Sequence, residues 1–301
     1  MPTPERSLTA MALRLDGRVY LFDCGEGAQV PYRRARLGLR GLHLVAVSHH
    51  HADHVLGLPG ILMMRAQMPD PPPLTVLGPP NVERFIQHVC RDLEIHINYD
   101  IRFIAWHPDA GPLAYEDDRV RVIWNLLDHT VPCLGYRLEE RDRPGRFAPE
   151  TATALGVPKG PLWGELQAGK TIQGLCGPVS PDQVLGPSRL GRRVAYATDT
   201  APTEALVRLL HGVDIAFLEG MYAPDEAEHA AEKKHLTVIQ ACEAATRACV
   251  RRLVLTHLSP RYDETDVLRM EETARRHHPE VEMGRDGRVF VIPFGRIGSM
   301  V

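Results

Sequence analysis

The sequence lacks any long hydrophobic run: no apolar stretch reaches the roughly eighteen residues that a membrane-spanning helix needs. Its first residues, Met-Pro-Thr-Pro-Glu-Arg, are polar and rich in proline. A secretory signal would instead carry an apolar core behind a positively charged start. We therefore expect a protein of the cytoplasm that has no membrane partner.

The sequence also lacks paired cysteines and a strong net charge. Its six cysteines form no C-x-x-C pair and no spacing typical of a disulfide framework, so we expect reduced thiols. Cys24 and Cys133 lie near residues singled out below, and small apolar packing is the role expected of them. The formal charge of −3 excludes the whole-chain basic signature that many nucleic-acid-binding proteins carry. Bound divalent cations would add positive charge that this count omits.

Short apolar segments alternate with amphipathic ones along most of the chain. Thr9 to Leu15 and Val19 to Phe22 are predicted to form a hairpin, and Val281 to Ile292 a second hairpin around Asp286-Gly287. The alternation of strands with helices predicts an α/β layered fold. Further strands are expected at 44–48, 74–77, 120–127, 194–198, 215–219 and 253–256, and helices at 58–67, 82–90, 204–210 and 237–249, the last with Thr237 as its N-cap.

One segment breaks this alternation. From about Arg141 to Pro187 the apolar periodicity fades, while glycine and proline recur, as in Pro144-Gly145. A stretch of this length without clear core elements is usually a functional excursion or a disordered linker. The residues alone leave both interpretations open.

The stretch Ser-His-His-His-Ala-Asp-His, which ends at His54, directly follows a predicted strand. Alternate residues of an extended segment project to the same side, so His49 and His51 can converge on one metal ion. Beyond the turn, Asp53 and His54 can face a second ion. Imidazole nitrogens together with carboxylate oxygens suit zinc, and manganese less strongly. His50 is left over and is expected to point away.

Three more residues of ligand type stand at the ends of predicted strands. His129, Asp199 and His257 follow the strands at 120–127, 194–198 and 253–256. Because sites of open α/β sheets collect outside strand ends, we expect these side chains to meet the histidine-rich stretch.

The candidate ligands divide into two sets. One ion would be held by His49, His51 and His129, and the other by Asp53, His54 and His257. Asp199, with two oxygens, can bridge the ions, which could then share a hydroxide. The histidines without such a context are interpreted as surface residues, among them His88, His96, His211, His277 and His278.

The pattern H-x-H-x-D-H, followed by a later His, Asp and His, resembles the metallo-β-lactamase superfamily. The resemblance implies a four-layer αββα sandwich with the ions at one edge of its two sheets. Longer motifs resemble ribonuclease Z, the endonuclease family that removes 3′ trailers from precursor tRNA. These motifs are Pro2-Thr-Pro-Glu-Arg6, Leu21-Phe-Asp-Cys-Gly-Glu-Gly-Ala-Gln29, His54-Val-Leu-Gly-Leu-Pro-Gly60, His129-Thr-Val-Pro-Cys-Leu-Gly-Tyr136, Tyr196-Ala-Thr-Asp-Thr200, His235-Leu-Thr237 and Leu255-Thr-His-Leu-Ser-Pro-Arg-Tyr262.

The resemblance to ribonuclease Z runs nearly end to end and implies a substrate and an assembly. It implies one metallo-β-lactamase-like domain over residues 1–301 with an inserted arm over 141–180 that grips tRNA away from the cut. The implied partners are precursor tRNA and a second copy of the chain, in a homodimer. The implied cofactor is two Zn²⁺ per chain, with Mn²⁺ as the alternative.

The resemblance also implies catalytic roles. Asp53 would accept a proton as well as bind metal, and His235 would donate a proton or contact phosphate. Glu219 would orient His235. A hydroxide that bridges the ions would attack the phosphorus, and the ions and nearby donors would stabilise the added negative charge.

Five further residues have expected supporting roles. Asp23 ends a predicted strand and is expected to support the ligand loop through hydrogen bonds. Glu26 and Gln29 fit either a polar helix start or support of the site. Arg261 and Tyr262 fit either phosphate and base contacts or a structural surface role.

The chain departs from the family pattern at its start and in the arm. Relatives usually have a short strand and a glycine-rich turn before the first motif, so either the start is mis-assigned or this edge strand is dispensable. A lost strand would expose the edge of the strand at Thr9 to Leu15. Pro4 and Ser7 replace the lysine and asparagine common in a loop that bears on how a CCA 3′ end is treated. Basic residues of the arm are offset by acidic ones, which leaves recognition of shape.

Two other functions stay open on the sequence. One is a metal hydrolase of small phosphodiesters or esters, with the middle segment as a lid. The other is a non-enzymatic RNA-binding protein with a relict site, against which the complete ligand set argues.

Overall fold

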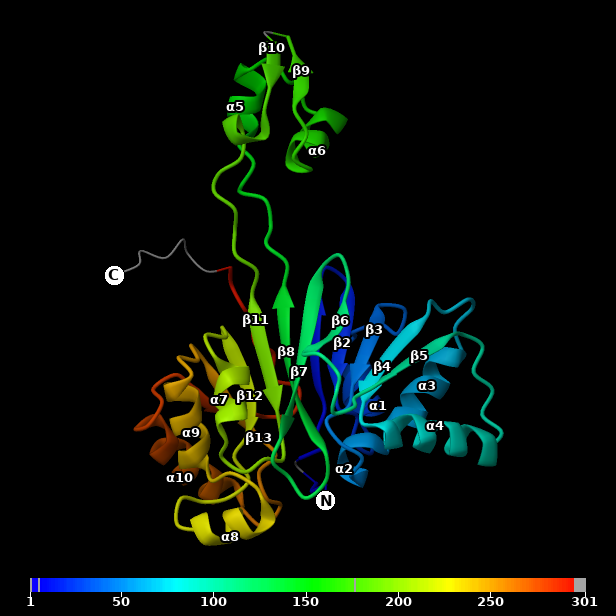
Figure 1. Ribbon diagram of the computed structural model, residues 1–301, viewed down its shortest axis with the longest axis vertical. Helices are drawn as coiled ribbons and strands as arrows, with labels where there is room; N and C mark the ends of the chain where they lie inside the picture. The colour runs from blue at the N-terminus through cyan, green and yellow to red at the C-terminus, as the bar shows by residue number, and fades with distance from the viewer. Residues whose placement is uncertain (1, 5, 176, 295–301) are drawn as a thin grey trace. The chain divides into compact units, whose positions relative to one another are not determined.

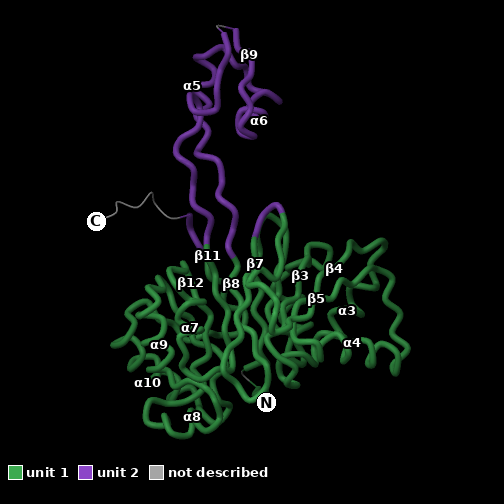
Figure 2. Tube along the Cα trace, viewed as in Figure 1, with its two compact units in different colours: residues 1–117, 121–138, 193–291 green, residues 118–120, 139–192, 292–301 purple. Residues whose placement is uncertain are grey.

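Two β-sheets form the centre of the computed structural model, which describes residues 2–4, 6–175 and 177–294. The chain divides into two units, coloured in Figure 2. Unit 1 comprises residues 1–117, 121–138 and 193–291, and unit 2 comprises residues 118–120, 139–192 and 292–301. No helix among the described residues is both long and apolar enough to span a bilayer.

The first sheet has five strands in the order β1-β2-β3-β4-β5. Its first two strands pair antiparallel around Asp16 and Gly17, whose positive φ angles of 47° and 85° suit a two-residue hairpin turn. The predicted first hairpin is therefore confirmed, and β1 lies at the edge of the sheet. The other pairs are parallel. The elements of this half are β1 (Met11–Leu15), β2 (Arg18–Phe22), α1 (Gln29–Arg34), β3 (Leu42–Ala46), α2 (Ala52–Val55), α3 (Leu58–Ala66), β4 (Leu74–Gly78), α4 (Pro80–Asp92) and β5 (Ile101–Ala105).

The second sheet has seven strands in the order β14-β13-β12-β11-β8-β7-β6. Strands β11 to β14 run parallel to one another. Thr237 caps α9 as predicted, with its side chain accepting a hydrogen bond from the Gln240 backbone. The elements of this half are β6 (Leu113–Glu116), β7 (Val120–Leu127), β8 (Cys133–Glu140), β11 (Arg193–Ala197), α7 (Glu204–Leu210), β12 (Ile215–Glu219), α8 (Ala227–Lys233), α9 (Val238–Arg247), β13 (Leu253–Thr256), α10 (Glu264–Arg275) and β14 (Val281–Met283).

The two sheets pack against each other and carry helices on their outer faces (Figure 1). Alternation along β2 shows how the sequence produces these layers. Val19 and Leu21 belong to the core shared with α1 to α4. Phe22 points the other way, and its ring lies 5.9 Å and 5.6 Å from the rings of Tyr136 and Tyr196 in the second sheet. The predicted αββα order of layers is confirmed.

Unit 2 contains its own small core, although the sequence shows no periodicity there. Short elements surround it, and the chain segments that enter and leave are joined by β-bridges between Arg143 and Arg189 and between Phe147 and Leu185. The elements are α5 (Pro149–Ala154), α6 (Pro161–Gln167), β9 (Ile172–Gly174), β10 (Gly177–Val179) and a 3₁₀ turn η1 (Pro181–Gln183). The buried apolar residues are Ala152, Val157, Leu166, Ile172, Val179 and Val184.

The predicted hairpin at Val281 to Ile292 is wrong. Gly287 does adopt a positive φ of 73°, but only β14 forms, and it pairs in parallel with β13. The residues after the Asp286-Gly287 turn form no returning strand, and Phe290 packs its side chain against the protein. Phe290 lies 5.6 Å from the Phe217 ring and receives the guanidinium of Arg252 on its face.

The expectation that His278 lies at the surface is also wrong. Its side chain is buried behind α10, with Nε2 3.1 Å from the Val250 carbonyl oxygen. His88, His96, His211 and His277 are exposed, as expected.

Arg65 in α3 is fully buried and holds several loops together. Its guanidinium donates to the Leu39 and Pro72 carbonyls and lies 5.1 Å from the centre of the Tyr99 ring. Substitution of Arg65 by methionine should lower the free energy of unfolding by about 3 kcal/mol, because two carbonyls lose their partners inside the protein. The same substitution at exposed Arg91 should change it by less than about 0.5 kcal/mol. Urea denaturation measures both, and equal effects would contradict this role.

Candidate metal centre

Four strand ends deliver polar side chains to one edge of the two sheets. The loop after β3 carries His49 and His51, and α2 begins directly behind it with Asp53 and His54. Three strands of the second sheet, β7, β11 and β13, end just before the other candidate ligands, which are His129, Asp199 and His257. The strand-end placement expected from the sequence thus brings all seven side chains together.

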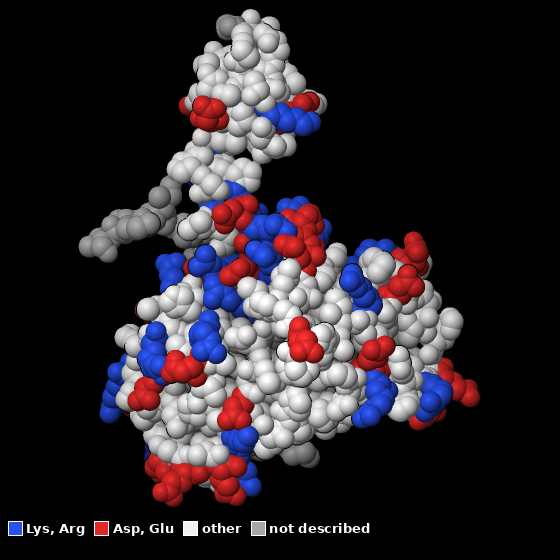
Figure 3. Space-filling view, in the orientation of Figure 1, with Lys and Arg blue, Asp and Glu red and all other residues white. Residues whose placement is uncertain are grey.

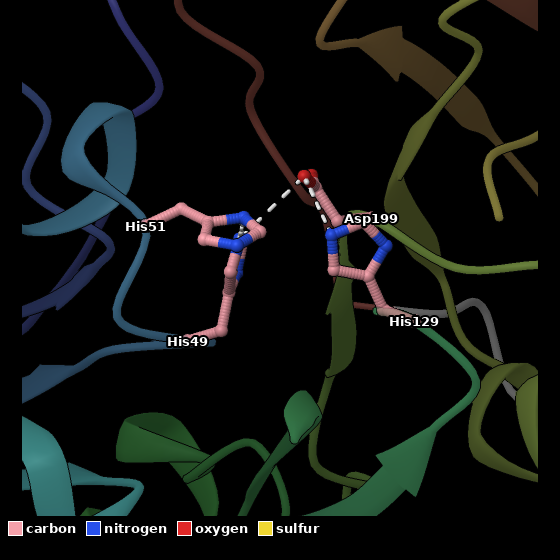
Figure 4. Close-up of side chains that lie close together, drawn as sticks. All are labelled: His49, His51, His129 and Asp199. Atoms are coloured by element: carbon pink, nitrogen blue, oxygen red, sulfur yellow. Dashed lines mark hydrogen bonds and ion pairs between the residues drawn. The ribbon is translucent and has the colours of Figure 1, made fainter. Parts of the chain in front are cut away.

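One group of potential ligand atoms comprises His49, His51, His129 and Asp199, all within 4.8 Å of one another. Figure 4 shows the two histidines of the first sheet facing His129 and Asp199 of the second. The Oδ2 atom of Asp199 lies 3.6 Å from His49 Nε2 and 3.7 Å from His129 Nε2. His49 Nε2 lies 2.9 Å from His51 Nδ1. These atoms converge on one point, as ligands of one cation do.

A second group comprises Asp53, His54 and His257. The Oδ2 atom of Asp53 lies 3.5 Å from Nε2 of both histidines. The other carboxylate oxygen of Asp199, Oδ1, lies 3.6 Å from His54 Nε2 and 3.4 Å from His257 Nε2. Asp199 therefore offers one oxygen to each group, which is the geometry of a bridging ligand.

The electrostatics of the cluster suit a bound cation. Burial, together with neighbouring His54, lowers the pKa of His49 to about 2, so its imidazole stays neutral and keeps a lone pair. Burial alone would raise the pKa of Asp199, but His257 and the other histidines hold it well below its usual range. Hydrogen bonds to His257 and His54 likewise lower the pKa of Asp53 against the effect of burial. A neutral His49 beside ionised Asp199 and Asp53 is in the state in which metal ligands bind. Against the effect of burial, Asp23 and Asp199 raise the pKa of His54, so its Nε2 would release a proton when a cation binds.

Unpartnered polar atoms test whether a metal fits. The Nε2 atoms of His54 and His129 are buried and have no hydrogen-bond partner among the described residues. Buried polar groups normally have a partner, so each such atom needs an explanation. Each atom faces a different oxygen of Asp199, and a cation between that nitrogen and that oxygen would give it a partner. The donor set of imidazoles and carboxylates fits zinc.

Three residues of the site adopt a left-handed backbone, which is rare outside glycine. Asp23, Asp199 and His257 have φ angles of 54°, 45° and 57°, and each lies within two residues of the end of a strand. Such conformations persist only where the surroundings enforce them, and they cluster at functional sites. At these three residues the left-handed backbone turns the side chain away from the strand and towards the cluster.

His235 joins the cluster from the loop between α8 and α9. Its Nδ1 atom lies 3.1 Å and 3.2 Å from the two carboxylate oxygens of Glu219, the last residue of β12. The same carboxylate accepts a hydrogen bond from the Leu236 backbone. Burial would lower the pKa of His235, but the hydrogen bond to Glu219 raises it above its ordinary value. The other side of the ring faces Asp199 and His257, with which His235 forms a third potential ligand group.

The remaining candidates have varied surroundings. Glu26 is exposed, and Gln29 packs closely against Gly60 at the start of α1. Arg261 pairs with Glu226 at 2.7 Å, and its guanidinium lies about 5 Å from the rings of both Tyr222 and Tyr262.

The thiols of Cys24 and Cys133 and the side chain of His50 are not placed as metal ligands. Cys24 and Cys133 are buried, and burial raises the pKa of Cys24 to about 12, which suits apolar packing. His50 belongs to none of the three potential ligand groups found in the described part of the chain.

Sequence reasoning without the family resemblance missed two features of this site. Nothing in the spacing of His235 ties it to the other histidines, because a loop and a helix separate it from every predicted strand end. Tyr196 and Ser48 bind the Asp23 carboxylate, yet Tyr196 has the pattern of an ordinary apolar strand residue. Ser48 lies in the ligand loop that Asp23 is expected to support, whereas only the packing of one sheet on the other reveals the contact of Tyr196.

Comparisons with known proteins agree with this geometry. A family model described as "Metallo-beta-lactamase superfamily" matches residues 4–62, and one described as "Beta-lactamase superfamily domain" matches residues 184–258. Among solved structures, the short form of human tRNase Z superposes with a TM-score of 0.68 over 97% of this chain and 95% of that chain, at 22% identity. This likeness supports the metallo-β-lactamase fold.

Curated relatives are similar over almost the full length. Ribonuclease Z of Treponema denticola is 40% identical over 287 residues, which cover 95% of this chain and 92% of the relative. Ribonuclease Z of Methanosarcina acetivorans is 36% identical over 294 residues, which cover 98% and 95%. With the fold, the ligand cluster and this identity in agreement, the chain belongs to the ribonuclease Z family of the metallo-β-lactamase superfamily.

Proposed function

We propose that this protein is a metal-dependent endoribonuclease that removes 3′ trailers from precursor tRNA by hydrolysing one phosphodiester bond. The observation that carries the proposal is the pair of ligand groups joined by Asp199, in a chain similar to ribonuclease Z over nearly its whole length. Two adjacent cation sites suit phosphodiester chemistry, because they can bind the attacking and leaving oxygens together. We further propose a cytoplasmic location.

We propose two ions per chain, zinc in the first instance and manganese as the alternative. His49, His51 and His129 would hold one, Asp53, His54 and His257 the other, with Asp199 between them. Bound there, the ions would lower the pKa of water and stabilise negative charge on the phosphate.

The chain's own residues would move the protons. Asp53 is partly exposed, with 36% of its side chain accessible, so it can accept a proton from an incoming water. His235 is held by Glu219 through Nδ1, which leaves Nε2 to donate a proton to the leaving oxygen or to contact the phosphate.

We propose that residues 141–180 of unit 2 grip tRNA away from the cut. The folded core of the segment supports this role, because a binding surface needs fixed side chains. The upper part of unit 2 in Figure 3 carries few charged side chains, of both signs, and Lys170 pairs with Glu165 at 3.8 Å. Recognition would therefore depend on the shape of the folded RNA more than on charge.

Deletion of residues 147–185 would distinguish two roles for this segment, a grip on tRNA and a lid over a small-molecule site. The ends to be joined are adjacent, since the Gly186 N–H donates to the Arg146 carbonyl at 3.0 Å, and a Gly-Ser link can close them. We expect KM for precursor tRNA to rise about 10²-fold, the scale of a lost second contact. Hydrolysis of bis(p-nitrophenyl) phosphate should stay at the wild-type rate. An unchanged KM for precursor tRNA, together with an altered rate on bis(p-nitrophenyl) phosphate, would favour the small-substrate hydrolase.

We propose a homodimer that uses an apolar patch on α1 to α3. Leu56, in the turn between α2 and α3, and Met63, in α3, are 44% and 46% exposed. Gly60 packs against Gln29 of α1, and Val30, the residue after Gln29, is 52% exposed. Exposed apolar side chains on elements that pack together are typical of an interface.

Substitution of Met63 by glutamate should convert the dimer into monomers, because a charge would lose its water in the middle of the patch. Light scattering after gel filtration gives the mass directly. Leu268→Glu, on exposed α10, is the matched control and should remain dimeric. A dimeric Met63→Glu variant would place the interface elsewhere.

A further inference from the structure

Asp23 stands at the centre of a buried hydrogen-bond network beneath both ligand groups. Its Oδ1 atom accepts a hydrogen bond from the Ser48 backbone at 2.6 Å. Its Oδ2 atom accepts from the Ser48 hydroxyl at 2.7 Å, from His54 Nδ1 at 2.7 Å and from the Tyr196 hydroxyl at 2.6 Å. Asp23, Ser48 and His54 are fully buried, and Tyr196 is 1% exposed.

This network determines which nitrogen of two ligand histidines carries the proton. His54 donates from Nδ1 to the Asp23 carboxylate, so its lone pair is on Nε2. The Ser48 hydroxyl gives its single hydrogen to Asp23 and must therefore accept from His49 Nδ1, which lies 3.0 Å away. His49 and His54 thus both direct Nε2 towards Asp199, and they belong to different ligand groups. One carboxylate orients a ligand of each ion.

Tyr196 reaches this carboxylate from the other sheet. It lies on β11, whereas Asp23 follows β2, and the two residues are 173 positions apart. A hydrogen bond from a neutral donor to an ionised carboxylate is short and strong, and inside a protein it also limits rotation of the carboxylate. We propose that Tyr196 is a positioning residue for both metal sites, acting through Asp23 on His54 and, through Ser48, on His49.

Tyr136 provides a matched control within the same core. It is also fully buried, and its ring also packs against Phe22, at 5.9 Å against 5.6 Å for Tyr196. Its hydroxyl donates to the Val47 carbonyl at 2.8 Å, a neutral acceptor that holds no ligand ring. Substitution of either tyrosine by phenylalanine removes one buried hydroxyl from the same layer, but only Tyr196→Phe takes a donor from Asp23.

The test measures zinc affinity rather than turnover, in the full-length chain, for wild type, Tyr196→Phe and Tyr136→Phe. Each protein competes for zinc with a chromophoric chelator, and thermal unfolding of the metal-free forms reports stability. We expect Tyr196→Phe to bind zinc about 10- to 100-fold more weakly than wild type, the usual effect of losing a partner of a metal ligand. Tyr136→Phe should match wild type in zinc affinity, while the two variants lose similar thermal stability.

Equal zinc affinities in the two variants would overturn the proposal, whether both match wild type or both are weakened alike. The inference rests on the proposed metal centre, and the two can fail separately. Wild-type protein that binds no zinc and no manganese would overturn the metal centre itself. Wild type that binds two ions, with Tyr196→Phe unchanged, would overturn only the role of Tyr196.

Discussion

Substitution of Asp53 by alanine should lower kcat/KM for precursor tRNA by about 10³-fold or more. The variant loses a carboxylate that lies 3.5 Å from both His54 Nε2 and His257 Nε2, and with it the proposed proton acceptor. Loss of a proton acceptor alone typically costs 10²- to 10⁴-fold, and weaker metal binding adds to this. Single-turnover cleavage of an end-labelled precursor measures the loss, and metal analysis of the same sample reports the ions retained.

The fold should survive this substitution, because Asp53 is partly exposed and its removal leaves little buried space. The matched control is Asp128→Ala. Asp128 is a neighbouring exposed carboxylate that pairs with Lys234 at 2.8 Å and belongs to none of the ligand groups found among the described residues. We expect it to retain near-wild-type cleavage. Full activity in Asp53→Ala would contradict the proposed mechanism.

Substitution of His235 by alanine should lower kcat by about 10²- to 10⁴-fold without changing the number of bound ions. His235 is close enough to Asp199 and His257 to be a ligand, so the metal count is the deciding measurement. A proton donor can be removed with both ions still bound, whereas removal of a ligand would release or weaken one. The control is His229→Ala, at a half-exposed histidine of α8 that belongs to none of the ligand groups found among the described residues.

Substitution of Glu219 by glutamine should test the role of His235 as proton donor, because it should change how kcat depends on pH. Glu219 raises the pKa of His235, so the protonated ring persists to higher pH than an ordinary histidine would. A proton donor loses activity as pH rises through its pKa. Without the Glu219 charge that pKa falls, and the alkaline limb of the kcat profile should move to lower pH. An unmoved limb would exclude His235 as the titrating donor.

The meeting of the seven candidate ligands could be predicted because it follows from topology. Parallel strands of one sheet end at a common edge, so residues placed just after β11 and β13 must come close. The residues after β3 meet them because the αββα fold, which the family resemblance implies, stacks the two sheets. His235 depends on a loop instead, and only the family resemblance singled it out. Tyr196 depends on the stacking of the two sheets, which local spacing does not encode.

Two parts of the fold, the segment after Asp286-Gly287 and unit 2, could not be predicted from the sequence. The Asp286-Gly287 turn signal is present, but the strand that should return from it is replaced by the contact of Phe290 with Phe217. In unit 2 the elements are too short for a period to emerge: α5 has six residues, α6 seven and β9 three. Hydrophobic periodicity needs longer windows than these. A folded segment without periodicity is therefore indistinguishable from a linker in the sequence alone.

The most direct test of the proposed function is to map the products from a precursor tRNA with a 3′ trailer. The end-labelled RNA would be incubated with metal-replete wild-type protein and with Asp53→Ala, in zinc and separately in manganese. We predict a single cut at or near the discriminator base with wild type and no cut with the variant. An intact precursor in the presence of wild-type protein that still hydrolyses bis(p-nitrophenyl) phosphate would contradict a tRNA 3′ endonuclease.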